Sequence, residues 1–151
     1  MGDRTSVTLT VLRSQAAKAQ ELFSEDYASD EDVSGDLLLY SWEFEDVNYG
    51  ELPFLDLLEA AGIAYDSDWS NGSEYESGCA SCRFTPEGKA IEKHLYGDND
   101  NLPLYVLKQL MDDPVALRQR IVDLIEEHTV LSWDDQETYG ARYRMRQLLI
   151  V

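Results

Sequence analysis

The sequence contains few cysteines and no long apolar segment. Cys79 and Cys82 are its only cysteines, which excludes a disulfide framework and favours a reducing compartment. No apolar run approaches the roughly 18 residues that a membrane-spanning helix requires. The segment that follows Met1 also lacks the apolar stretch of a signal peptide. We therefore expect a cytoplasmic protein that is not attached to a membrane.

Basic residues are scarce as well, and they are absent from a long central region. Between positions 19 and 82 there is no Lys, Arg or His, whereas Asp and Glu occupy 17 positions. The whole chain has 12 basic and 30 acidic residues, which gives a net charge of −18. This charge repels phosphate groups, so we expect no direct binding to nucleic acid or to an anionic membrane. It favours a basic protein as the partner.

The remaining composition is that of an ordinary folded domain. With 151 residues, of which 44% are hydrophobic, the chain is long enough for one core, and we predict a single domain over residues 1–151. Hydrophobic periodicity predicts the element order β-α-β-α-β-β-β-α-α-β. The central strands are separated by hairpin-type turns. This order predicts an α+β fold, with an antiparallel or mixed sheet of about five to six strands and three to four helices packed on it.

The clearest predicted strand covers residues 37–47. Trp42 and Phe44 fall on one face of this segment, and Glu43 and Glu45 fall on the other. Alternation of this kind is typical of a strand with one buried face and one solvated face.

Turn and capping residues mark further boundaries. Pro53 suits the first turn of a helix that Gly62 ends. Asp113 suits the cap of a later helix, whose apolar stripe is the most regular in the chain. The polar, acidic residues 25–36 predict a solvated loop.

The C-terminal segment 139–151 is basic, and its pattern fits either a strand or a helix. Arg142, Arg144 and Arg146 alternate with apolar residues, as they would on a strand. We therefore predict a strand here.

The sequence Cys79-Ala80-Ser81-Cys82 has the spacing of half a tetrahedral zinc site. No second pair follows at short range, so the further ligands would have to come from His94 or His128. A reactive thiolate needs a helix N-terminus or a basic neighbour, whereas this segment continues as strand and turn. We therefore interpret both cysteines as small buried strand residues, with a metal site formed by Cys79, Cys82 and His94 as the alternative. No catalytic residue and no cofactor is predicted.

Acidic residues recur at a spacing of two positions beside aromatic residues. On a strand, such pairs point the same way about 6.7 Å apart, which is comparable to neighbouring phosphates of a nucleic acid. Rings next to carboxylates are also common in protein interfaces. The alternative is a solvated outer face that keeps the protein in solution. The predicted partner-binding residues are Glu43, Glu45, Asp66, Asp68, Trp69, Glu74, Tyr75 and Glu76.

Three hypotheses about function follow from these patterns. The first is an acidic interaction module that docks a basic protein partner, as inhibitors, immunity proteins and nucleic-acid mimics do. The second is a metal- or thiol-dependent enzyme that uses the Cys79 and Cys82 pair. The third is a self-associating accessory protein, a homodimer in which the arginine-bearing C-terminal segment meets an acidic face of the second copy.

Overall fold

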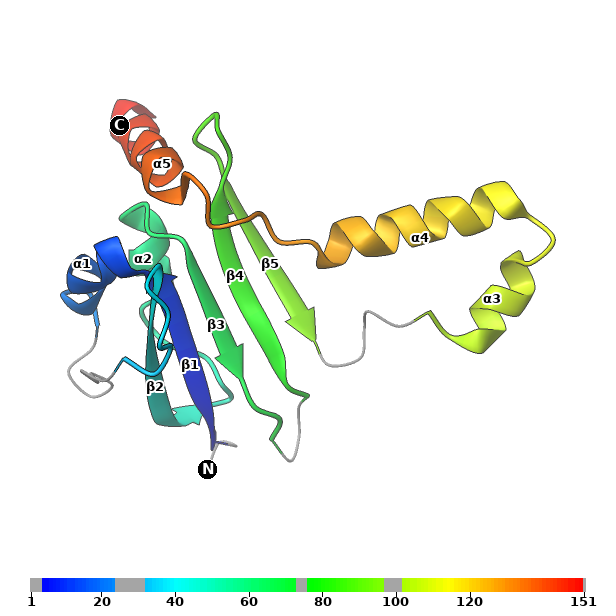
Figure 1. Cartoon of the computed structure of the whole chain (residues 1–151), viewed down its shortest axis with the longest axis horizontal. Coiled ribbons are helices and arrows are strands. Elements are labelled where there is room, and N and C mark those ends of the chain that lie inside the picture. Colours follow the sequence, from blue (N-terminus) through cyan, green and yellow to red (C-terminus); the bar gives the residue numbers. More distant parts are fainter. Residues whose placement is uncertain (1–3, 24–31, 73–75, 97–101, 151) are drawn as a thin grey trace.

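The computed structural model describes residues 4–23, 32–72, 76–96 and 102–150, and these form an α+β fold with one antiparallel five-stranded sheet (Figure 1). The strands are β1 (Arg4–Leu12), β2 (Leu39–Asn48), β3 (Tyr65–Trp69), β4 (Gly78–Phe84) and β5 (Ala90–Tyr96), in the sheet order β2-β1-β3-β4-β5. The helices are α1 (Ala16–Gln20), which follows the 3-10 helix η1 (Arg13–Gln15), α2 (Leu55–Ala60), α3 (Leu104–Leu110), α4 (Pro114–His128) and α5 (Gln136–Ile150). The predicted fold class is thus confirmed.

The sheet has one core face and one open face, and the alternation of β1 and β2 explains why. Leu9 is fully buried on β1, and Trp42 lies directly opposite it on β2. On the other face, Thr8 lies opposite the exposed Glu43. Successive strand residues point to opposite faces, so one face collects the apolar side chains. The strand predicted for residues 37–47 is confirmed from Leu39 onward, whereas Leu37 and Leu38 precede it and are exposed.

The core lies between this face and the segment that contains α1 and α2. Phe23 packs against Trp42, Phe44 and Phe54 with ring-centroid distances of 4.7, 5.5 and 4.7 Å. Leu58 of α2 is fully buried beneath them. Each large apolar side chain removed from water in this way stabilises the fold by about 1.5–3 kcal/mol.

The C-terminal segment is a helix, so the strand predicted for residues 139–151 is wrong. Gln136 begins α5, and its side-chain amide forms two hydrogen bonds with the backbone of Phe84. Its Oε1 atom accepts from the Phe84 amide at 2.7 Å, and its Nε2 atom donates to the Phe84 carbonyl at 3.0 Å. Arg142 and Arg146 donate to the carbonyls of Pro86 and Glu87. Residues four positions apart share one side of a helix, which lets both arginines reach the same turn. Five alternating residues are too few to separate a strand from a helix.

The helices α3 and α4 extend away from the sheet as an arm (Figure 1). The predicted start of α4 is confirmed, since the Asp113 side chain accepts a hydrogen bond of 3.1 Å from the amide of Ala116. Neither helix has a buried residue, and Ile125 on the regular apolar stripe is 61% exposed. The regular apolar spacing correctly predicted a helix here. It did not indicate that the apolar stripe of this helix would remain exposed. None of the described helices is both long and apolar enough to cross a membrane.

Two glycines allow α5 to approach the end of α2. Gly62 ends α2 with a φ of +73°, as its position in the sequence predicted. A Cβ atom at Gly140 of α5 would lie 1.9 Å from the carbonyl oxygen of Gly62. The two backbones are therefore in direct contact.

We expect Gly140→Ala to destabilise the protein, although alanine favours an isolated helix by about 1 kcal/mol over glycine. The added methyl group forces α5 away from Gly62, and overpacking of this kind lowers the free energy of unfolding by about 1–3 kcal/mol. Urea unfolding of the variant and the wild type measures the difference. A variant that is more stable than the wild type would contradict this close contact.

Candidate functional site

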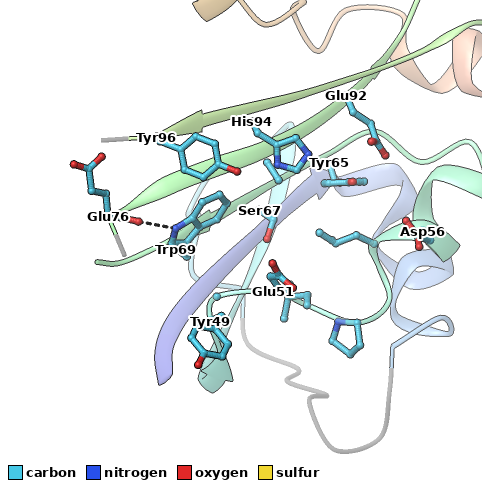
Figure 2. A pocket seen from close by; sticks show the side chains of 15 residues that line it. Tyr49, Glu51, Asp56, Tyr65, Ser67, Trp69, Glu76, Glu92, His94 and Tyr96 are labelled. Carbon is cyan, nitrogen blue, oxygen red and sulfur yellow. Dashed lines mark hydrogen bonds between the residues drawn. The ribbon is translucent and has the colours of Figure 1, made fainter. Parts of the chain in front are cut away.

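A cleft of about 700 Å³ opens on the core face of the sheet, beside α2 (Figure 2). Residues 49–53, which follow β2, and the first turn of α2 with Leu55 and Asp56 form one wall. Strands β3, β4 and β5 form the other wall and the floor. This volume is within the range of small-ligand sites, and it accommodates one or two side chains of a partner.

Three rows of residues, each directly opposed across β3, β4 and β5, build the sheet side of the cleft. The rows are Trp69–Gly78–Tyr96, Ser67–Ala80–His94 and Tyr65–Cys82–Glu92. In each row the β4 residue is small, and larger side chains from β3 and β5 stand on either side in two of the rows. The small residues of β4 therefore make the floor.

Trp69, Tyr96 and Tyr49 form the aromatic end of the cleft (Figure 2). The rings of Trp69 and Tyr96 lie 5.8 Å apart in an edge-on arrangement, and the indole nitrogen of Trp69 donates to the Glu76 carbonyl at 2.9 Å. A Cβ atom at Gly78 would lie 2.5 Å from the Trp69 ring, so only glycine allows the ring to cover β4 here. The Trp69 ring is thus held in place, and Tyr96 and Tyr49 are 46% and 45% exposed.

The opposite end of the cleft carries a carboxylate cluster, formed by Asp56 and Glu59 of α2 and Glu92 of β5. Their oxygens lie within 4.8 Å of one another. Burial and the repulsion of the neighbouring Glu92 carboxylate raise the pKa of Glu59 above its ordinary value of 4.5. Burial is also the main reason that the pKa of the Tyr65 hydroxyl is raised, and the three carboxylates add to the effect.

Ser67 lies on the floor between the two ends. Its side chain is 1% exposed, and its hydroxyl has no hydrogen-bond partner among the residues that the structure describes. A buried hydroxyl without a partner costs about 1–3 kcal/mol. Such an orphaned group at the floor of a cleft is typical of a place where a ligand or water completes the bonding.

The predicted partner-binding residues are divided between the two faces of the sheet. Trp69 and Glu76 line the cleft. Glu43 and Asp68 lie on the open face, in one row with Thr8 between them. Asp66 shares that face, but it forms an ion pair of 3.0 Å with Arg83.

The remaining members of that predicted set are placed as follows. Glu45 is exposed on β2, two positions after Glu43. Glu74 and Tyr75, like residues 25–31 of the predicted acidic loop, lie outside the described residues.

Cys79 and Cys82 point to opposite faces of β4, because they are three residues apart on a strand. His94 lies opposite Ala80 and faces the cleft, so the structure does not bring the three candidate ligands together. Burial raises the pKa of both thiols to about 12, which disfavours the thiolate that metal binding or nucleophilic attack requires.

Sequence reasoning missed most of the cleft. It did not single out Glu51, Asp56, Glu59, Glu92 or Tyr96 as site residues. One signal was present, because Glu92, His94 and Tyr96 alternate in the sequence and share a face if the segment is a strand. Nothing in the local pattern indicated that α2 would bring its acids to that face.

Comparison of the chain with protein-family models, with curated proteins and with solved structures gives no match. Any functional assignment therefore has to come from the cleft itself.

We expect both thiols to be alkylated slowly in the folded protein. At neutral pH a thiol whose pKa is about 12 is almost entirely protonated, and the thiolate is the reactive form. Mass spectrometry after brief iodoacetamide treatment, with a guanidinium-unfolded sample as the control, measures the rate. Equally fast labelling in both samples would contradict the assigned environments.

We expect Glu59→Gln to become more stable relative to the wild type as the pH rises. Because the pKa of Glu59 is raised in the folded protein, protonation of this carboxyl group stabilises the fold. The contribution is complete at pH values below the ordinary pKa of 4.5, and it is lost as the pH rises through the folded-state pKa. Urea unfolding at about pH 4 and about pH 7 in metal-free buffer compares the two proteins. Glu43→Gln, on the open face, controls for the loss of one charge. Equal differences at both pH values would show that Glu59 is not perturbed.

Proposed function

We propose that the chain is an acidic interaction module that docks a positively charged segment of a basic protein partner in the cleft. The observation that carries this proposal is the lining of the cleft. Four acidic residues line the cleft together with aromatic residues, and none of the described lining residues is Lys or Arg. The four acidic residues are Glu51, Asp56, Glu76 and Glu92.

The aromatic end of the cleft suits both parts of a basic side chain. The aliphatic stem and the charge of Lys or Arg are both attracted to aromatic rings, and a cation over Trp contributes about 0.5–2 kcal/mol. Trp69 is the ring best placed for this contact, since its indole is already held by Gly78 and the Glu76 carbonyl. Glu51 lies between the ends and faces the same space (Figure 2).

The net charge of −18 also supports this proposal, because electrostatic attraction acts over long distances. It attracts a cationic partner during diffusion and makes association fast and dependent on salt. The charge also disfavours direct binding to nucleic acids and to anionic membranes. We further propose a cytoplasmic location, since the two cysteines are free and lie on opposite faces of one strand.

The cleft has more support than the open face as the docking surface. A phosphate-like row on the open face would need Asp66 beside Asp68, and Asp66 is already paired with Arg83. Self-association through the C-terminal arginines has less support as well. Arg142 and Arg146 already donate to carbonyls of the β4–β5 turn in the same chain.

We expect a short oligo-arginine peptide to bind the cleft, and the double variant Glu51→Gln/Glu76→Gln to bind it about tenfold more weakly. The double variant Glu43→Gln/Glu45→Gln has the same net charge but leaves the cleft intact, and it should keep nearly wild-type affinity. Titration calorimetry at low and high salt measures both. Equal weakening of the two variants would show that only overall charge attracts the peptide.

The same three proteins, immobilised, identify the natural partner in a cell lysate. A basic protein that the wild type and the Glu43/Glu45 variant retain, and that the Glu51/Glu76 variant does not retain, is the expected result. Retention by all three or by none would contradict docking in the cleft.

A further inference from the structure

The hydroxyl of Ser67 differs from those of two other buried serines in the sheet. Ser41, Ser67 and Ser81 are 4%, 1% and 3% exposed. The Ser41 hydroxyl is hydrogen-bonded to that of Thr10 at 2.7 Å, and the Ser81 hydroxyl donates to Asp66 at 2.7 Å. The Ser67 hydroxyl has no partner among the described residues. Of the three serines, Ser67 is the one that lines the cleft.

The neighbours of Ser67 in the sheet cannot supply the missing hydrogen bond. It lies opposite Leu9 on β1 and Ala80 on β4, and neither of these side chains carries a polar atom. Figure 2 shows its hydroxyl oxygen on the side of the cleft where Glu51 lies. A hydroxyl can accept two hydrogen bonds, so a donor that enters the cleft would complete its bonding.

The surroundings of Ser67 define the kind of donor that fits. The indole of Trp69 is held by its hydrogen bond to the Glu76 carbonyl, and it offers a flat face to a cation. Trp69 and Ser67 are two positions apart on β3, so they share a face at a spacing of about 6.7 Å. Glu51 adds a carboxylate from the opposite wall. The donor must therefore stack on a ring while it donates to a carboxylate and to a buried hydroxyl.

A guanidinium meets these conditions better than an ammonium group does. It is planar, it stacks on aromatic rings, and its five N–H donors point in several directions within one plane. It is also weakly hydrated, whereas an ammonium group is compact and strongly hydrated. Because the Ser67 hydroxyl is buried, the group that reaches it loses water, and this loss costs the ammonium group more.

We infer that the cleft selects arginine over lysine in the docked segment, and that Ser67 determines this preference. The guanidinium stacks on Trp69, donates to the Glu51 carboxylate, and donates through a further N–H to the Ser67 hydroxyl. This inference rests on the docking proposal, and it specifies the partner as a basic segment that is anchored by an arginine.

Titration calorimetry with an oligo-arginine and an oligo-lysine peptide of equal length and charge tests the preference. Long-range attraction is the same for both peptides, so the ratio of their Kd values reports the contacts in the cleft. We expect the wild type to bind the arginine peptide at least about tenfold more tightly. Ser67→Ala should weaken binding of the arginine peptide about tenfold and change that of the lysine peptide much less. Ser41→Ala, which removes a buried hydroxyl from the open face, should keep the wild-type ratio.

Urea unfolding of the same two variants separates binding from folding. Ser67→Ala removes a hydroxyl that has no partner, so its urea midpoint should equal or exceed that of the wild type. Ser41→Ala removes a bonded hydroxyl and should lower the midpoint. A large decrease for Ser67→Ala would show that its hydroxyl already stabilises the fold, and would overturn the role assigned to it.

A third peptide requires only the wild-type protein. Asymmetric dimethylation of each arginine keeps the charge and removes N–H donors, so we expect at least about tenfold weaker binding than that of the unmethylated peptide. Equal or tighter binding of the methylated peptide, or equal binding of the arginine and lysine peptides, would overturn the inference and leave the docking proposal intact. If neither the arginine nor the lysine peptide binds, docking in the cleft is itself refuted, and this inference with it.

Discussion

The buried guanidinium of Arg83 is the interaction on which the rest of the structure depends. It lies on the open face of β4, is 4% exposed, and donates to the carbonyls of Tyr65 and Leu131. It also pairs with Asp66 and stacks 3.7 Å over the ring of Trp133. A buried charge is tolerated when it has hydrogen-bond acceptors and a counter-charge, and Arg83 has both. Through these contacts Arg83 joins two strands to the segment that follows α4, and this sets where α5 begins.

The candidate site lies on the core face of the same strands, and it is connected to the contacts of Arg83 on the open face. The Tyr65 carbonyl that Arg83 binds belongs to the residue whose ring enters the cleft, so the position of that ring is coupled to the open face. Next to it on β4, the small residues Gly78 and Ala80 leave room for the cleft. One face of β3 and β4 therefore carries the structural ion pair, and the other carries the candidate binding surface.

The docking proposal rests on the negative charge at the cleft, where the described lining includes four acidic residues. Two acids elsewhere in the described chain form ion pairs, Asp32 with Arg13 and Asp66 with Arg83. At the cleft, α2 and β5 bring carboxylates together, and the described lining includes no Lys or Arg. Repulsion at such a place lowers the free energy of unfolding, and a bound cation relieves it. In the docking proposal, a basic side chain of the partner supplies that cation.

The sequence by itself determined the elements whose signals are local. The alternation around Trp42 follows from strand geometry, and Asp113 caps its helix by a contact with an amide three residues away. Only the tertiary structure decided that the C-terminal segment is a helix, because Gln136 is held by Phe84, 52 positions earlier. It also decided that Glu92 meets the acids of α2. Backbone sterics and capping act over a few residues, whereas strand register and packing join residues that are far apart in the chain.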